Sequence, residues 1–304
     1  MDSALSTTAL PIALAIIMFG LGLSLTVSDF ARVARHPKAV GIALVCQLIV
    51  LPAIAFGLIL LFDLPALLAV GMMLLAASPG GTTANLFSHL FRGDVALNVS
   101  LTAVNSVIAV VTLPLITNFA LGYFDPPEGA NLGLQFAKVV QIFAIVLIPV
   151  ALGVWVRRIR PAFADRMDRP VRVGSAVVLA LVIVGTVVAE RENVGGYLAD
   201  IGVVVFLFCV LSLSIGFLVP RGLGVTYRQS IACSMEIGIH NSTLAITIAI
   251  SLLDSTRIAV PAAVYGVMMF PLAALFGWAI TYRRTAPDQP DGVSEPSPGA
   301  APRR

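Results

Sequence analysis

Long apolar runs follow one another along almost the whole chain, and each is long enough to cross a lipid bilayer. A membrane-spanning helix needs about 20 consecutive, mostly apolar residues. The 304-residue sequence contains nine such segments: 9–29, 38–61, 66–91, 94–122, 131–157, 170–189, 196–219, 225–253 and 257–282. Runs of this length predict helices, because a helix satisfies its own backbone polar groups inside lipid. The expected fold class is therefore an all-α polytopic membrane protein with nine transmembrane helices.

The composition excludes soluble classes of protein. Hydrophobic residues make up 58% of the chain and charged residues only 12%, whereas a soluble domain carries about 25% charged residues. A soluble enzyme and a nucleic-acid binder are therefore excluded, and the lipid bilayer is the expected surrounding. The three cysteines all lie in apolar runs, so no disulfide framework is expected.

Basic residues predict the orientation. Of the 19 Lys and Arg residues, 16 fall on one side of the nine spans and two on the other, while Lys138 lies inside a span. Because cytoplasmic loops are enriched in Lys and Arg, the N-terminus is expected outside and the C-terminus in the cytoplasm. The expected location is a bacterial inner membrane. Residues 285–304 contain five prolines and predict a disordered cytoplasmic tail.

Two spans contain helix-breaking sequences near their middles. The third holds the run 78–85 (SPGGTTAN) and the eighth the run 236–241 (EIGIHN). Proline removes a backbone donor and glycine favours non-helical angles. The two spans are five apart and run in opposite directions, so they predict an inverted repeat (4+5) with two discontinuous, crossing helices. Such helices mark the central site of a transporter, although two ordinary kinks are the alternative.

Glu236 is the one acidic residue deep inside a span. A carboxylate at that depth is costly unless it is paired, hydrated or bound to a cation. No Lys or Arg of the same span can pair with it. A cation from solution is the favoured partner, with a neutral hydrogen-bonded carboxyl and a proton relay as alternatives.

The fourth span carries a polar stripe on one helical face, formed by Asn98, Thr102 and Asn105, with Ser106 beside it. Amide and hydroxyl oxygens are hard neutral ligands, so with one carboxylate they suit a monovalent cation. For Asn105 and Ser106, interhelical hydrogen bonding is the favoured interpretation.

Asn85 and Asn241 stand where the second halves of the two interrupted helices would begin. Free N–H groups and the positive end of the helix dipole attract anions there. The pattern therefore predicts cotransport of a cation with an organic anion.

Between residues 9 and 282 the sequence resembles the bile acid:sodium symporter family in its nine-helix form. The resemblance is carried by Gln47, by the run 79–85 followed by RGDVAL at 92–97, and by the run 236–241. It implies a core domain (38–122 and 196–282) that rocks against a panel domain (9–29 and 131–190) to give alternating access.

The resemblance also implies two sodium sites and a substrate site. The first sodium site would use Ala84, Asn85, Asn98, Thr102 and Glu236, and the second Gln47, Glu236, His240 and the carbonyls of Ile237 and Ile239. The substrate would contact Thr82 and Asn241. The chain departs from the family pattern at Ala84 and Asn98, where serine is usual, and at His240, where glutamine is usual.

The function we expect is a sodium-coupled symporter that imports an organic anion, with sodium as the coupling ion and no other cofactor. The apolar run 267–270 stands where bile-acid carriers tend to be polar, which favours small anions such as keto or hydroxy acids. Proton coupling through Glu236 and His240, and arsenite efflux, are the transporter alternatives. An intramembrane enzyme using Ser234 and a non-transporting receptor are the others, and the oligomeric state stays open.

Overall fold

The computed structural model describes residues 33–81, 83–126, 136–167 and 194–282, with isolated positions between 15 and 26 and between 170 and 177. These residues are largely helical, and the described part contains one isolated backbone bridge. Most of the expected spans 9–29 and 170–189, and the tail 285–304, lie outside the described residues. The number of nine spans and the inverted repeat therefore stay predictions.

The helices follow the apolar runs. In chain order they are α4 (Pro37–Val45), η2 (Cys46–Val50), α5 (Leu51–Leu61), α6 (Ala66–Ala77), α7 (Thr83–Leu90), α8 (Val95–Phe124), α9 (Phe136–Ile159), α11 (Val194–Gly222), α12 (Tyr227–Gly238), α13 (Ser242–Ser251) and α14 (Thr256–Thr281). Within the described part, four continuous helical stretches are long and apolar enough to cross a membrane: Pro37–Leu61, Val95–Phe124, Ile201–Gly222 and Thr256–Thr281. The chain is an integral membrane protein.

Short polar side chains fix where several helices begin. Asp94, Thr226, Asn241 and Ser255 each accept a hydrogen bond from the backbone N–H three residues later. Such caps satisfy N–H groups that the first helical turn leaves without partners. The cap by Asn241 starts a new helix in the middle of a span.

Both expected interruptions occur at the predicted positions. α6 ends at Ala77, and Ser78 is extended, with φ −71° and ψ 143°. Pro79 disfavours a helical conformation for the residue before it, which explains why the helix ends there. The second interruption separates α12 from α13 at residues 239–241.

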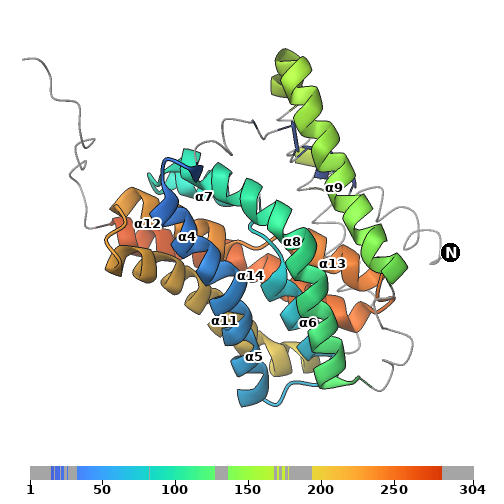
Figure 1. Ribbon diagram of the computed structural model, residues 1–304. Helices are drawn as coiled ribbons and strands as arrows, with labels where there is room; N and C mark the ends of the chain where they lie inside the picture. Colours follow the sequence, from blue (N-terminus) through green and yellow to red (C-terminus); the bar gives the residue numbers. More distant parts are fainter. Residues whose placement is uncertain are drawn as a thin grey trace, which may run out of the picture.

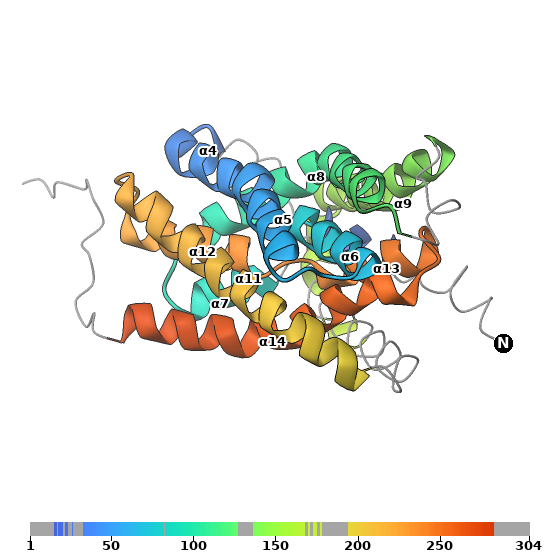
Figure 2. The same ribbon diagram turned by 90° about the horizontal axis from the view of Figure 1, so that it is seen from below.

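The two helices that precede the interruptions lie at the centre of the packed group. α6 packs against α5, α8, α13 and α14, while α12 packs against α4, α7, α8 and α11. Figure 1 shows α8 running diagonally across this group, and in Figure 2 α8 lies beside α6. A glycine permits the close approach of α11 and α12, because a methyl group at Gly216 would lie 2.8 Å from the Cα of Ser234.

α9 lies on the flank of the other helices (Figure 1). It contacts the described residues of the first span through two glycines. A methyl group at Gly22 would lie 2.2 Å from the Val150 carbonyl oxygen, and one at Gly153 would lie 2.3 Å from the Phe19 carbonyl oxygen. Small residues let membrane helices approach at backbone distance, so this contact pairs the first span with α9.

Candidate functional site

The two interruptions lie against each other in the interior. The Gly81 N–H donates to the Ile239 carbonyl at 2.7 Å, and the Asn241 N–H donates to the Pro79 carbonyl at 2.8 Å. These bonds form a short antiparallel bridge. They satisfy backbone groups that the interrupted helices leave without partners, and they join two distant parts of the sequence.

Glu236 lies in the last turn of α12, fully buried, and its carboxylate faces α8. Asn98 Nδ2 and Thr102 Oγ1 donate to Oε2 at 2.8 and 2.5 Å, and Asn105 Nδ2 donates to Oε1 at 3.2 Å. The three donors lie on one face of α8, as their spacing predicts. Within the described part, the ion pair joins Arg157 to Asp165 and does not involve Glu236. Neutral donors therefore hold this carboxylate and stabilise its negative charge.

Gly80 of the first interruption lies directly against the same carboxylate. A methyl group at Gly80 would lie 2.3 Å from Glu236 Oε1 and 2.7 Å from Oε2. At the neighbouring Gly81 the nearest atom, the His240 carbonyl oxygen, would be 3.4 Å away, an ordinary contact. The missing side chain at Gly80 thus gives the carboxylate its room.

Four buried amide oxygens near the interruptions and on α8 have no hydrogen-bond partner: Gln47 Oε1, Asn85 Oδ1, Asn98 Oδ1 and Asn105 Oδ1. Leaving such an oxygen unpaired costs about 1–3 kcal/mol. Asn98 and Asn105 bind Glu236 through their amide nitrogens, so their free oxygens lie beside the carboxylate. One carboxylate with neutral oxygens is a donor set that fits a hard monovalent cation such as sodium.

Two residues of the expected second sodium site, Gln47 and His240, meet at one carbonyl. Gln47 Nε2 donates to the Ser78 carbonyl at 3.1 Å, and His240 Nδ1 lies 3.1 Å from the same oxygen. Because a carbonyl only accepts, Nδ1 carries a proton, and Nε2 of a neutral ring is an acceptor. Nε2 is buried without a partner. The ring packs between Phe208 and Tyr265, at centroid distances of 5.6 and 5.3 Å.

A stretch of π-helix positions Gln47. The segment η2 interrupts the regular helix over Cys46–Val50, and π-helical turns are common at functional sites. The sequence carries no proline or glycine inside this segment, so composition did not predict it.

The other expected sodium ligands are also at the interruptions. Ala84 is fully buried and offers only its backbone. Ile237 lies in the last turn of α12, where carbonyls lack helical partners. The Ile239 carbonyl already accepts from Gly81 but keeps a second lone pair. Thr82, expected to contact substrate, lies outside the described residues.

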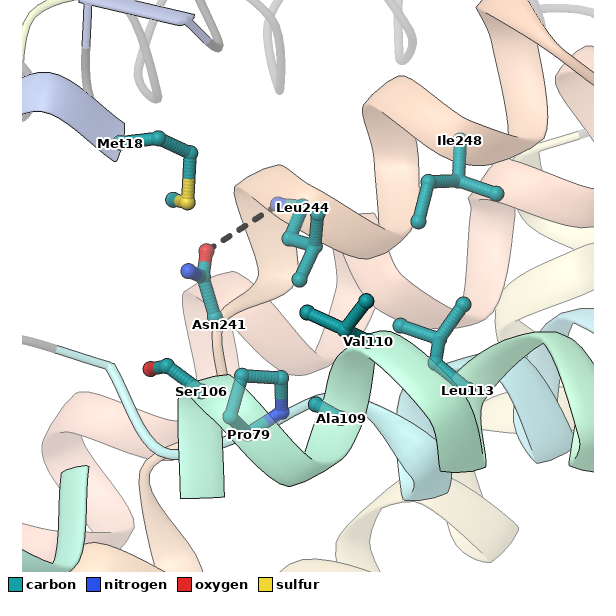
Figure 3. A pocket seen from close by; sticks show the side chains of 9 residues that line it. All are labelled: Met18, Pro79, Ser106, Ala109, Val110, Leu113, Asn241, Leu244 and Ile248. Atoms are coloured by element: carbon teal, nitrogen blue, oxygen red, sulfur yellow. Dashed lines mark hydrogen bonds between the residues drawn. The ribbon is translucent and has the colours of Figure 1, made fainter. Parts of the chain in front are cut away.

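A small cavity marks the expected substrate side of the interruptions. Figure 3 shows Asn241 and Ser106 beside it, with Met18 from the first span. The remaining lining residues are apolar: Pro79, Ala109, Val110, Leu113, Leu244 and Ile248. Its volume of about 10 Å³ is room for one water molecule. An organic anion therefore needs a more open conformation.

A larger hollow of about 370 Å³ is lined by apolar residues of α5, α6 and α8, and it carries none of the site's polar groups.

The start of α13 offers an anion fewer free donors than the sequence suggested. The Ser242 N–H donates to the His240 carbonyl at 3.0 Å, and the Leu244 N–H donates to Asn241 Oδ1 at 3.1 Å. The Ala245 N–H donates to the Asn241 carbonyl at 3.3 Å. The Asn241 side-chain amide nitrogen thus becomes the main candidate donor.

Sequence reasoning left two contacts of Glu236 out of the site. The sequence favours interhelical hydrogen bonding for Asn105, and the structure shows such a bond, with the Glu236 carboxylate itself as the partner. Its place on the stripe with Asn98 and Thr102 was the available signal. For Gly80, the sequence predicts only that it breaks the helix. Ser106, for which interhelical hydrogen bonding was also favoured, donates instead within its own helix, to the Thr102 carbonyl at 2.7 Å, and borders the cavity.

Comparison with known proteins identifies the family. The family model described as sodium bile acid symporter matches residues 11–196. The chain belongs to the sodium bile acid symporter family. The uncharacterized sodium-dependent transporter YocS of Bacillus subtilis is 30% identical over 260 residues, which are 84% of this chain and 78% of YocS. The probable chloroplastic sodium/metabolite cotransporter BASS1 of Arabidopsis thaliana is 30% identical over 290 residues, 91% of this chain and 67% of that protein. The human ileal sodium/bile acid cotransporter is 23% identical over 288 residues, 93% of this chain and 81% of the relative.

This family consists of sodium-dependent transporters, and the chain is not an enzyme. The hydroxyl of Ser234, the nucleophile considered for an intramembrane enzyme, donates to the Leu213 carbonyl at 2.7 Å.

Proposed function

We propose that this chain is a sodium-coupled symporter that imports a small organic anion by alternating access. The observation that carries the proposal is the buried Glu236 carboxylate, which receives three neutral donors from α8 and lies beside amide oxygens without partners. Members of the family are named as sodium-dependent carriers of bile acids or metabolites. Sodium at Glu236 would balance the charge and fill the lone pairs of those oxygens.

The organic anion is assigned to the far side of the interruptions, at Asn241. The cavity there combines an amide and a hydroxyl with apolar walls and has room for about one water molecule. Small keto or hydroxy acids suit such a surface better than a bulky substrate does. Because the interruptions are bridged by hydrogen bonds, a cation on one side and an anion on the other would stabilise the same conformer.

The core and panel domains expected from the sequence remain part of the proposal, as do the inverted repeat and the cytoplasmic C-terminus. The glycine contact between the first span and α9 supports placing both in the panel. Movement of the panel against the core would widen the cavity, since Met18 of the first span closes one side of it.

The test is uptake by proteoliposomes under an inward sodium gradient, compared with a choline gradient and with an acid-outside gradient. Glu236→Gln keeps the size of the side chain and removes its charge, so we expect folded protein without sodium-dependent uptake. Ser234→Ala is the matched control two residues away, because that hydroxyl faces Leu213, and it should transport normally.

Uptake by Glu236→Gln with an unchanged sodium dependence would show that the carboxylate is not the coupling site. Uptake driven by the acid-outside gradient without sodium would instead establish the proton-coupled alternative.

A further inference from the structure

Asn105 has an arrangement that the implied sodium sites do not account for. Its side chain lies on α8 with an exposed fraction of 1%. Nδ2 donates to Glu236 Oε1 at 3.2 Å, while Oδ1 has no partner. Asn98, seven residues earlier, does the same on the other carboxylate oxygen, with Nδ2 at 2.8 Å and an unpaired Oδ1. The carboxylate therefore lies between two equivalent amides.

The orientation of the Asn105 amide follows from the carboxylate. If the amide were flipped, its oxygen would face a carboxylate oxygen with no hydrogen between them, which is repulsive. The nitrogen therefore points to Glu236 and the oxygen points away from it. Nitrogen and oxygen share one carbon atom, so this oxygen still lies next to the charged group.

A buried oxygen in that position needs a donor or a cation. The Thr102 hydroxyl proton is directed at Glu236 Oε2, at 2.5 Å, and both amide nitrogens are directed at the carboxylate. The side-chain donors on this face of α8 are thus engaged. Hard cations take both carboxylate and amide oxygens, so a small cation at the carboxylate would supply the partner that the Asn105 oxygen lacks.

We infer that Asn105 Oδ1 is a ligand of the cation that binds at Glu236. The inference rests on the proposed sodium-coupled function and deepens it. The α8 face then contributes two amide oxygens, from Asn98 and Asn105, one on each side of the Glu236 carboxylate. Asn105 compensates for Ala84, which has no side-chain oxygen to offer.

Two substitutions separate the oxygen of Asn105 from its nitrogen. Asn105→Leu removes both atoms at similar size, whereas Asn105→Asp removes the nitrogen and keeps an oxygen. The measurement is the melting temperature of the purified full-length protein as sodium chloride replaces choline chloride at constant ionic strength. Ligands that bind the folded state raise this temperature.

Asn105→Leu should need about tenfold more sodium than the parent for half of the thermal shift, the effect of losing one buried polar contact. Asn105→Asp should respond at the parent's sodium concentration or below it. Thr117→Val is the matched control, because Thr117 is also buried on α8 with an unpaired oxygen but is distant in sequence from the stripe. Its sodium response should equal the parent's.

The inference is wrong if Asn105→Asp loses sodium affinity as far as Asn105→Leu does, since the amide nitrogen would then be the part that matters. It is also wrong if Asn105→Leu responds like the parent while Glu236→Gln does not, and in that case the proposed function stands. If the parent itself shows no sodium-dependent shift, both fail. If Asn105→Leu does not fold, Asn105→Asp decides: a ligand predicts tighter sodium binding, and a packing role predicts weaker binding.

Discussion

The two interruptions lie against each other but contribute different chemistry. The first contributes backbone: the Pro79 carbonyl, the Gly81 N–H and the bare α-carbon of Gly80 against the carboxylate. The second contributes side chains, with Glu236 before the break and His240 within it. The charge thus comes from one interruption, and the other determines how much room that charge has.

This difference predicts how each interruption fails when it is altered. A change in the second interruption alters which groups are present, while a change in the first alters where those groups can lie. Interiors are close-packed, so displacing a carboxylate by a fraction of an ångström breaks its hydrogen bonds with α8. The first interruption should therefore be sensitive to size.

Within the first interruption, the largest effect is expected from Gly80→Ala. The added methyl group would overlap Glu236 and push its carboxylate away from Thr102, and overpacking of this kind costs about 1–3 kcal/mol. Sodium-dependent uptake should fall at least about tenfold, the rate equivalent of about 1.4 kcal/mol. Gly81→Ala is the control, because its methyl group meets only ordinary contacts at 3.4 Å and beyond.

A second substitution tests whether Gly80 acts through the carboxylate. Glu236→Asp shortens that side chain by one methylene, so the pair Gly80→Ala with Glu236→Asp should transport better than Gly80→Ala alone. Equal loss in Gly80→Ala and Gly81→Ala would mean that the whole loop requires glycine, and would remove the size argument.

Much of this asymmetry was visible in the sequence. The interruptions were predicted from Pro79, the paired glycines and the polar run at 236–241, because those residues disfavour a helix in any surrounding. Glu236 was found because a deep carboxylate is costly. The stripe of Asn98, Thr102 and Asn105 followed from helical spacing alone.

Other features depend on tertiary contacts that no local pattern encodes. The role of Gly80 appears only when α12 brings Glu236 against it. The His240 tautomer depends on the Ser78 carbonyl of another span. The π-helical turn at Gln47 lies in an ordinary apolar run, so its local sequence gives no sign of it.

Substitutions of Thr102 and Asn85 should have intermediate effects on sodium-dependent uptake, and the effect should be larger at Thr102. The Thr102 hydroxyl donates to Glu236 Oε2 at 2.5 Å, whereas Asn85 Oδ1 follows the first interruption without a partner. Thr102→Val should raise the sodium concentration for half-maximal uptake about tenfold or more, the scale of one lost buried contact to a charged group. Asn85→Ala should raise it by less. The reverse order would mean that the sodium ion lies nearer the first interruption than the α8 contacts indicate.

The smallest effect concerns His240, where the second interruption offers a ring nitrogen instead of an amide oxygen. Its Nδ1–H is held by the Ser78 carbonyl, so the group that can face an ion is Nε2, a poor ligand for sodium. Protonation of Nε2 would place a positive charge near the sodium at Glu236 and oppose its binding. Sodium-dependent uptake should therefore fall in acid, and the Hill coefficient for sodium should be about one, since a single site cannot exceed that value.

His240→Gln replaces the nitrogen with an oxygen and removes the proton site. It should flatten the acid limb of the pH profile by a few-fold and, if Gln47 then completes a second site, raise the Hill coefficient above one. Phe208→Leu is the control for packing of the His240 ring, because it removes the stacked aromatic ring and leaves the imidazole in place. A pH profile and Hill coefficient identical in the parent and in His240→Gln would mean that the ring supports the bridge and takes no part in ion binding.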